Sequence, residues 1–242
     1  MSLRGALKGA PLFMELTMAR HLNEDISYCQ LDGHLYFLDL QHDRYFQLSQ
    51  PLEHDFLRYL ESPDHADLDI GNLIRNNLLS QTSATSSALP YPALGPPSQS
   101  LIEATSLGCR IAPTMILDVF LSVVAMRWQL KTRPLKIILQ MLAQYRHRRT
   151  RLVANDEAET RRRIEEAAAA FNHIRPYVPI ETRCLIDSLA MIRYLARRRL
   201  HAHLVMGVSC DPFSAHAWVQ YGPLILNDTV GNALAHVPIR VI

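Results

Sequence analysis

Residues 184–228 decide the fold of this chain, and they read CLIDSLAMIRYLARRRLHAHLVMGVSCDPFSAHAWVQYGPLILND. The first part carries apolar residues at helical spacing, which predicts a helix that begins at Cys184. From Leu204 onward the pattern changes to apolar runs broken by turn residues, which predicts strands that continue to Ile242. Helices followed by an antiparallel sheet are typical of an α+β domain.

A segment rich in Ser, Thr and Pro, residues 81–100, is predicted to be a linker. Such a composition buries little and breaks both helices and strands. It divides the chain into a small module over residues 15–80 and a larger domain over 101–242. The larger domain is expected to begin with three helices, which the apolar spacing places at 113–130, 134–146 and 155–172.

The small module is predicted to be a three-stranded β-meander followed by helices. The strands are expected at 26–31, 34–40 and 44–48, with a hairpin turn at Asp32-Gly33. One helix is expected to start at Pro51, after Ser49, and a second to cover 66–79. This outline is winged-helix-like, and it is too small for an enzyme with its own cleft.

Cys184 stands in the first turn of its predicted helix, which suits a nucleophile. A thiol attacks as the thiolate, and the partial positive charge of a helix N-terminus favours that form. The free N–H groups there could also stabilise the oxyanion of an acyl-transfer intermediate. Thr182 is the expected N-cap. A lone helical Cys is more often a buried apolar residue, so its position alone does not indicate catalysis.

His216 and Asp228 are predicted to face each other across a hairpin centred on Gly222, the midpoint of the two positions. Directly opposed side chains lie about 5 Å apart at Cβ. The carboxylate could then orient the imidazole while its other nitrogen faces Cys184, as in a Cys-His-Asp triad. A lone His on a strand is more often structural, and a register shift of one residue would place the pair on opposite faces. The joint arrangement of all three residues nevertheless favours catalysis.

The overall composition indicates a folded, soluble protein, and its net charge is too small to imply a polyanion partner by itself. The net charge is only +2 and 48% of the residues are hydrophobic. Arginine runs at 146–151, 161–163 and 197–199 are interpreted as solvated helix faces, with DNA binding as a minor alternative. Four scattered cysteines, with no signal peptide and no membrane-length apolar segment, predict reduced thiols in the cytoplasm.

No metal or other cofactor is expected. The side chains of His201, His203, Cys210 and His216 match no common zinc spacing, so surface or structural roles are favoured. Trp218 lies two residues after His216 and therefore on the same strand face. It is expected either to form a wall of the active site or to pack in the core.

Four ordered elements resemble the B protein of lasso-peptide biosynthesis, a leader peptidase of the transglutaminase-like cysteine protease group. These are ArgCysLeuIleAspSerLeuAla, LeuValMetGlyVal, ProPheSerAlaHisAlaTrpVal and LeuAsnAsp, which together cover about 45 residues. In the small module, TyrPheLeuAspLeuGlnHisAspArgTyrPheGlnLeu resembles the recognition element that binds leader peptides. Both on one chain resemble the fused form of the B protein.

That resemblance implies a function for each module. The N-terminal sheet would bind the leader of a ribosomally made precursor as an added strand. Cys184 would then cleave the leader off, with His216 as base and acid and Asp228 orienting it. The freed core would pass to an asparagine-synthetase-like cyclase that makes the macrolactam. Expected substrate contacts come from Tyr36, Leu38, Tyr45, Phe46 and Trp218.

Two other functions remain open at this stage. The same triad could transfer an acyl group to an amine instead of to water. Alternatively, the chain could be a non-catalytic peptide-binding scaffold in which Cys184 is inert. Neither a nucleic acid nor a membrane is expected as a partner.

Overall fold

The computed structural model of the chain describes residues 21–61, 70–80, 94–104, 111–150 and 157–242. The N-terminal module contains the predicted antiparallel meander. Its strands, in spatial order, are β2 (Ile26–Leu31), β3 (His34–Asp39) and β4 (Arg44–Gln47). Asp32 and Gly33, with φ of 48° and 83°, close the first hairpin, and Asp43, with φ of 50°, lies in the second.

The helical part of this module is shorter than predicted. Its other elements are α1 (Gln50–Glu61), α2 (Ile70–Arg75), β1 (His21–Leu22) and β5 (Leu79–Ser80). The helix predicted over 66–79 ends at Arg75, and its first four positions lie outside the described residues. Asn77, with φ of 61°, follows the end of the helix, and Leu79 then pairs with Leu22. The apolar residues Leu78 and Leu79 fit helical spacing, which is why the predicted helix was one turn too long.

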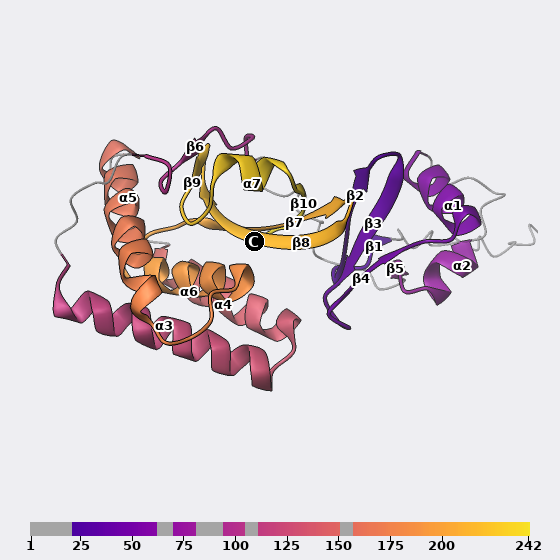
Figure 1. Cartoon of the computed structure of the whole chain (residues 1–242). Helices are drawn as coiled ribbons and strands as arrows, with labels where there is room; N and C mark the ends of the chain where they lie inside the picture. Colours follow the sequence, from indigo (N-terminus) through magenta and orange to yellow (C-terminus); the bar gives the residue numbers. More distant parts are fainter. Residues whose placement is uncertain (1–20, 62–69, 81–93, 105–110, 151–156) are drawn as a thin grey trace, which may run out of the picture.

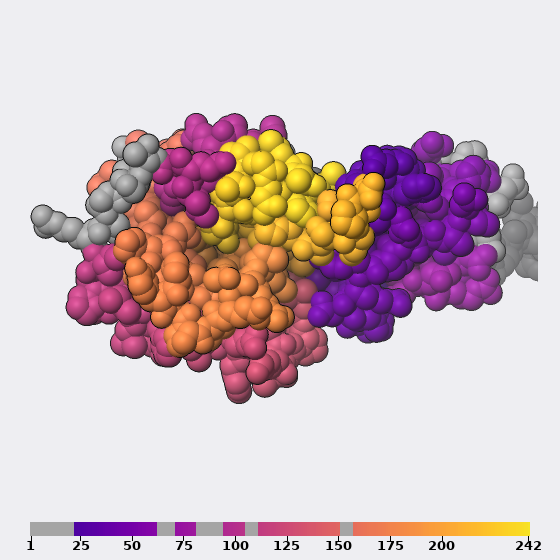
Figure 2. Space-filling model, viewed as in Figure 1, coloured from indigo at the N-terminus to yellow at the C-terminus, as the bar shows by residue number. Residues whose placement is uncertain are grey.

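The two faces of the N-terminal sheet pack against different partners. On one face Leu35 and Phe37 pack with Phe56 of α1, and the rings of the two phenylalanines lie 5.2 Å apart. On the other face Leu38 and Leu40 belong to the core of the C-terminal domain. The two modules therefore share a continuous apolar core, and Figure 2 shows the indigo lobe in contact with the orange and yellow strands.

The C-terminal domain is built on a five-stranded sheet with the order β10-β7-β8-β9-β6. The strands are β6 (Gln99–Ser100), β7 (His203–Cys210), β8 (Phe213–Tyr221), β9 (Leu224–Ile225) and β10 (Val237–Val241). The long hairpin of β7 and β8 extends towards the three-stranded sheet (Figure 1). β6 runs parallel to β9, so this sheet is mixed rather than purely antiparallel.

The predicted linker over 81–100 extends too far along the chain. Residues 81–93 lie outside the described residues, but Gln99 and Ser100 belong to the sheet. Ser98 and Gln99 donate their N–H groups to the carbonyl of Pro223, because β9 offers an edge whose backbone groups need partners. Ser and Pro content alone could not reveal a pairing partner so far along the chain.

Most of the helices of this domain lie on one side of the sheet, which confirms the predicted α+β class. They are α3 (Pro113–Thr132), α4 (Leu135–Thr150), α5 (Glu157–Ile174) and α6 (Cys184–Arg197), followed by the unpredicted short α7 (Val230–Leu234). α6 is central, with Leu189, Tyr194 and Leu195 fully buried against the sheet and the other helices. In Figure 1, α3, α4 and α6 lie below the sheet and α7 above it. None of the described helices has the length and apolarity needed to cross a membrane.

Candidate active site

Cys184 is the first residue of α6, as predicted, but Thr182 is not its cap. The N-cap is Arg183, and no side chain caps the helix. The segment before it is held instead by the buried Arg175, which donates to Asp187 at 2.6 Å and to the carbonyl of Glu181 at 3.1 Å. Arg175 therefore fixes the chain segment that leads into Cys184, a role that no sequence pattern indicated.

The Cys184 thiol is set up to ionise. The pKa of Cys184 is lowered by its hydrogen bond with His216, and further by the backbone of Ala217 and Leu185, which outweighs the effect of burial. A thiolate at this position is the reactive form. The thiol itself is half-buried, and the described Cys29 and Cys210 are also free cysteines.

His216 contacts Asp228, although not by the predicted register. β8 and β9 pair Gln220 with Ile225, so the hairpin centre is displaced by half a residue from Gly222 and β9 ends before Asp228. The prediction that His216 and Asp228 stand directly opposite each other on paired strands is therefore wrong. Their side chains still meet, through Nε2 of His216 and Oδ2 of Asp228, which leaves the other ring nitrogen for Cys184.

Asn227 explains how the chain leaves the sheet at this point. Its Oδ1 accepts the N–H of Val219 at 2.7 Å, and its Nδ2 donates to Ser188 Oγ at 2.9 Å. Ser188 in turn donates to the carbonyl of Ala217 at 3.0 Å. These bonds join α6 to β8 next to the candidate site, and so they fix the positions of Cys184 and His216 relative to each other.

The contact between His216 and Asp228 stabilises charge on both groups. The pKa of His216 is raised to about 9, first by its hydrogen bond with Asp228 and then by that with Cys184. Burial would raise the pKa of Asp228, but hydrogen bonds with His216, Asn232 and the backbone of Thr229 lower it below its ordinary value. The arrangement therefore favours the charged form of each group: a thiolate, an imidazolium and a carboxylate.

Asn232 on α7 is a site residue that the sequence did not reveal. Its Nδ2 donates to both carboxylate oxygens of Asp228, at 3.1 and 3.0 Å. Thr229 caps α7 by accepting the N–H of Asn232. The hydroxyl of Ser100 donates to the backbone carbonyl of Asp228 at 2.6 Å. The Thr229 cap was the one local signal, because Thr is a preferred N-cap and a short helix can follow it.

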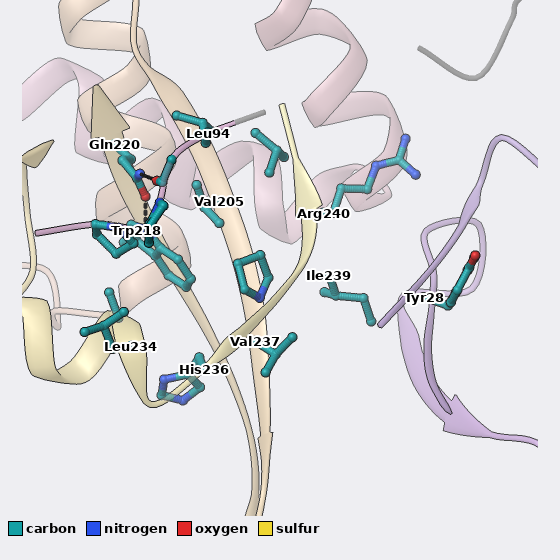
Figure 3. A pocket seen from close by; sticks show the side chains of 16 residues that line it. Tyr28, Leu94, Val205, Trp218, Gln220, Leu234, His236, Val237, Ile239 and Arg240 are labelled. Atoms are coloured by element: carbon teal, nitrogen blue, oxygen red, sulfur yellow. Dashed lines mark hydrogen bonds between the residues drawn. The ribbon is translucent and has the colours of Figure 1, made fainter. Parts of the chain in front are cut away.

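Two rings flank His216. Trp218 stacks at 6.0 Å between ring centroids and His236 lies at 5.0 Å. His236 is held by Ser214 Oγ at 2.9 Å and by the carbonyl of Asn232 at 2.8 Å. Both residues also line a cavity of about 540 Å³ under α7 and β10, which Figure 3 shows with Trp218 hydrogen-bonded to Gln220. Trp218 is 1% exposed, so of its two expected roles it packs in the core, against His216.

Comparisons with known proteins found a family model and a curated relative that match the chain. The transglutaminase-like superfamily matches residues 128–241, a range that contains Cys184, His216 and Asp228. Residues 128–241 form a transglutaminase-like domain. The Microcin J25-processing protein McjB of Escherichia coli is 36% identical over 74 residues, which are 31% of this chain and 34% of McjB. The match thus spans about a third of that relative's length, and no solved structure matches the chain.

Residues expected to bind the leader differ in how they lie relative to the transglutaminase-like domain. Leu38 is fully buried against it, so the prediction that Leu38 contacts a peptide is wrong. Tyr36 and Tyr45 are partly buried on the same face. Phe46 faces the other side, where it stacks on Phe37 at 5.2 Å. Peptide contacts of the last three remain predictions.

Within the described residues, no group of three or more His, Cys, Asp or Glu side chains is placed to hold a metal ion. His201 and His203 lie together at the start of β7, with ring centroids 4.7 Å apart. Burial lowers the pKa of His201 to about 4. Burial also lowers the pKa of His203, so both rings favour the neutral form.

Proposed function

We propose that the chain is a leader peptidase of lasso-peptide biosynthesis, which binds a precursor's leader and cleaves it from the core by thiol catalysis. The observation that supports this most is the contact of His216 with both Cys184 and Asp228 within a transglutaminase-like domain. The similarity to McjB, a protein that processes microcin J25, supports the substrate class.

The chemistry follows from the positions of the three side chains. The Cys184 thiolate attacks the scissile carbonyl carbon, and the N–H groups at the start of α6 stabilise the resulting oxyanion. The His216 imidazolium protonates the leaving amine as the C–N bond breaks, which leaves a thioester on Cys184. Neutral His216 then takes a proton from water, whose oxygen attacks the thioester and releases the thiolate. Asp228 keeps the ring oriented throughout.

The leader would add as a strand to the edge of β4. Of the two outer strands in the meander, β2 lies beside β10, where Arg240 donates to Ser27 Oγ at 2.9 Å. β4 pairs with β3 alone among the described strands, which leaves its other edge to accept a peptide. The freed core would then pass to an asparagine-synthetase-like cyclase. The free thiols of the described cysteines fit a reducing compartment such as the cytoplasm.

Cys184→Ala tests this proposal directly. The variant is expected to leave the precursor uncleaved while it still binds the leader, as measured by mass spectrometry and by titration with a labelled leader peptide. Cys210→Ala, which removes another half-buried thiol, is the matched control and is expected to cleave normally. Cleavage by Cys184→Ala would contradict the assignment.

A second candidate, acyl transfer to an amine, is favoured by the superfamily match alone. It differs in the species that attacks the thioester. Addition of a primary amine to the cleavage reaction separates the two activities: a peptidase gives the free carboxylate, whereas an acyltransferase gives the amide.

A further inference from the structure

Three aromatic side chains from both modules meet at the start of β8. Phe213 stacks on Tyr36 at 6.0 Å between ring centroids and meets Tyr45 edge-on at 5.7 Å. We call these three residues the aromatic wall. Phe213 is 49% exposed, although large apolar side chains are usually buried. The N-terminal module supplies two of the three rings, so the wall exists only because the modules share a core.

The wall is connected to Cys184 by one face of β8. Phe213, Ala215 and Ala217 alternate with His216 and therefore share the face that packs on α6. The Ala217 carbonyl accepts a hydrogen bond from Ser188 of α6 at 3.0 Å, and the backbone of Ala217 lowers the pKa of Cys184. At about 3.3 Å per residue, Phe213 lies about 13 Å from Ala217 along the strand. Between them stands Ala215, which is exposed and carries only a methyl group.

Tyr45 lies within electrostatic reach of the nucleophile. The pKa of Tyr45 is raised to about 12, mainly by burial, with contributions from the charges of Asp43 and Cys184. The wall and the thiol therefore border the same region.

We propose that the aromatic wall, with Ala215 as its floor, is a subsite that binds an apolar side chain on the leader side of the scissile bond. The inference rests on the proposed peptidase function. The leader side is assigned because the module that would hold the leader also supplies Tyr36 and Tyr45. Aromatic rings bind apolar groups by burying their surface, and a pocket of this kind discriminates one methylene by about tenfold or more.

Filling the floor is the sharpest test. Ala215→Leu is expected to lower kcat/KM at least tenfold for a precursor with a bulky apolar residue within about four residues of the scissile bond on its leader side. A precursor with Gly there is expected to lose much less. Phe213→Ala is expected to reduce the preference for the apolar residue over Gly. Trp128→Ala, at an exposed aromatic on α3, is the control and should retain the wild-type preference.

Alkylation of Cys184 separates failure of the subsite from failure of the proposed function. Iodoacetanilide carries an aromatic ring and iodoacetamide does not, so the ratio of their rates at Cys184, followed by mass spectrometry, reports on the wall without any cleavage. Phe213→Ala is expected to lower this ratio several-fold. A wild type that cleaves no precursor would overturn the peptidase proposal alone. An unchanged alkylation ratio in Phe213→Ala would overturn the subsite. So would a defect of Ala215→Leu that is relieved only by precursor substitutions on the core side of the scissile bond.

Discussion

The two sheets of the molecule differ in how they pack and in where their regular pairing ends. The N-terminal sheet is closed by local hairpins and packs on both faces, with Phe37 buried on one side and Leu38 on the other. The C-terminal sheet packs on α6 with one face, and its candidate reactive residues lie where regular pairing with β9 has stopped. Backbone hydrogen bonds between strands hold the sheets together, whereas side-chain hydrogen bonds hold the chain at the candidate site. Substitutions in the first sheet should therefore affect stability, and those at the end of the second should affect activity.

Asp228→Asn should give the largest effect, because it removes the group that raises the pKa of His216 to about 9. We expect kcat/KM to fall by about 10²- to 10⁴-fold, the usual range for acid–base catalysis. The alkaline limit of the pH–rate profile should also move below pH 9, because the imidazolium is lost earlier. An unchanged alkaline limit in the variant would contradict the role of Asp228.

The same variant makes a prediction about stability. The raised pKa of His216 means that its stabilising contribution is complete below its ordinary value of 6.5 and is lost as the pH rises through about 9. The lowered pKa of Asp228 gives a contribution that is present above its ordinary value of 3.8 and lost at lower pH. Urea denaturation of Asp228→Asn should therefore show its largest deficit between these two ordinary values, and a much smaller deficit above pH 9.

Leu38→Ala tests whether the modules share one core. The side chain is fully buried in the C-terminal core, so the cavity is expected to cost about 2–5 kcal/mol of unfolding free energy. Calorimetry should show one transition that moves as a whole. Leu60→Ala, at a residue that is 42% exposed on α1, is the control with little expected change. Two separate transitions, of which one moves, would show that the modules fold independently.

Gly207→Ala should have a smaller effect, on the support of His216. An added Cβ would lie 2.9 Å from the Trp218 ring and 3.1 Å from His236 Cβ, so both rings that flank the imidazole must move. Overpacking of this kind costs about 1–3 kcal/mol, measurable by urea denaturation followed by tryptophan fluorescence. Gly231→Ala adds a methyl group where nothing lies within 4 Å and should be neutral. Equal stability of the two variants would contradict tight packing around Trp218.

How much the sequence predicts depends on whether the signal is local. The hairpin at Asp32-Gly33 and the helix at Cys184 were predicted because turn residues and apolar spacing are local patterns. The pairing of β6 with β9 was missed because its partners are far apart in the chain. The register predicted around Gly222 was wrong because two residues, Gly222 and Pro223, lie between the paired Tyr221 and Leu224, and hydrophobic patterning does not fix the length of a turn.

The candidate site divides in the same way. Cys184, His216 and Asp228 could be proposed because each residue type has a chemical role at its position in an element. Asn232 and Arg175 act by orienting other groups, and their partners are specified only by tertiary contacts. Leu38 and Tyr45 lie on the same face of one sheet, and only the packing of the second module showed that Leu38 is fully buried while Tyr45 is partly buried.

The core that the modules share has a consequence for cutting the chain. A break introduced between Ser80 and Leu94 would leave Cys29, Leu38 and Leu40 on one fragment and their packing partners on the other. Each fragment alone would expose an apolar surface that water disfavours, so the halves are expected to associate when expressed together. The covalent junction would then become a subunit interface, and the proposed activity would belong to a two-chain complex and depend on protein concentration.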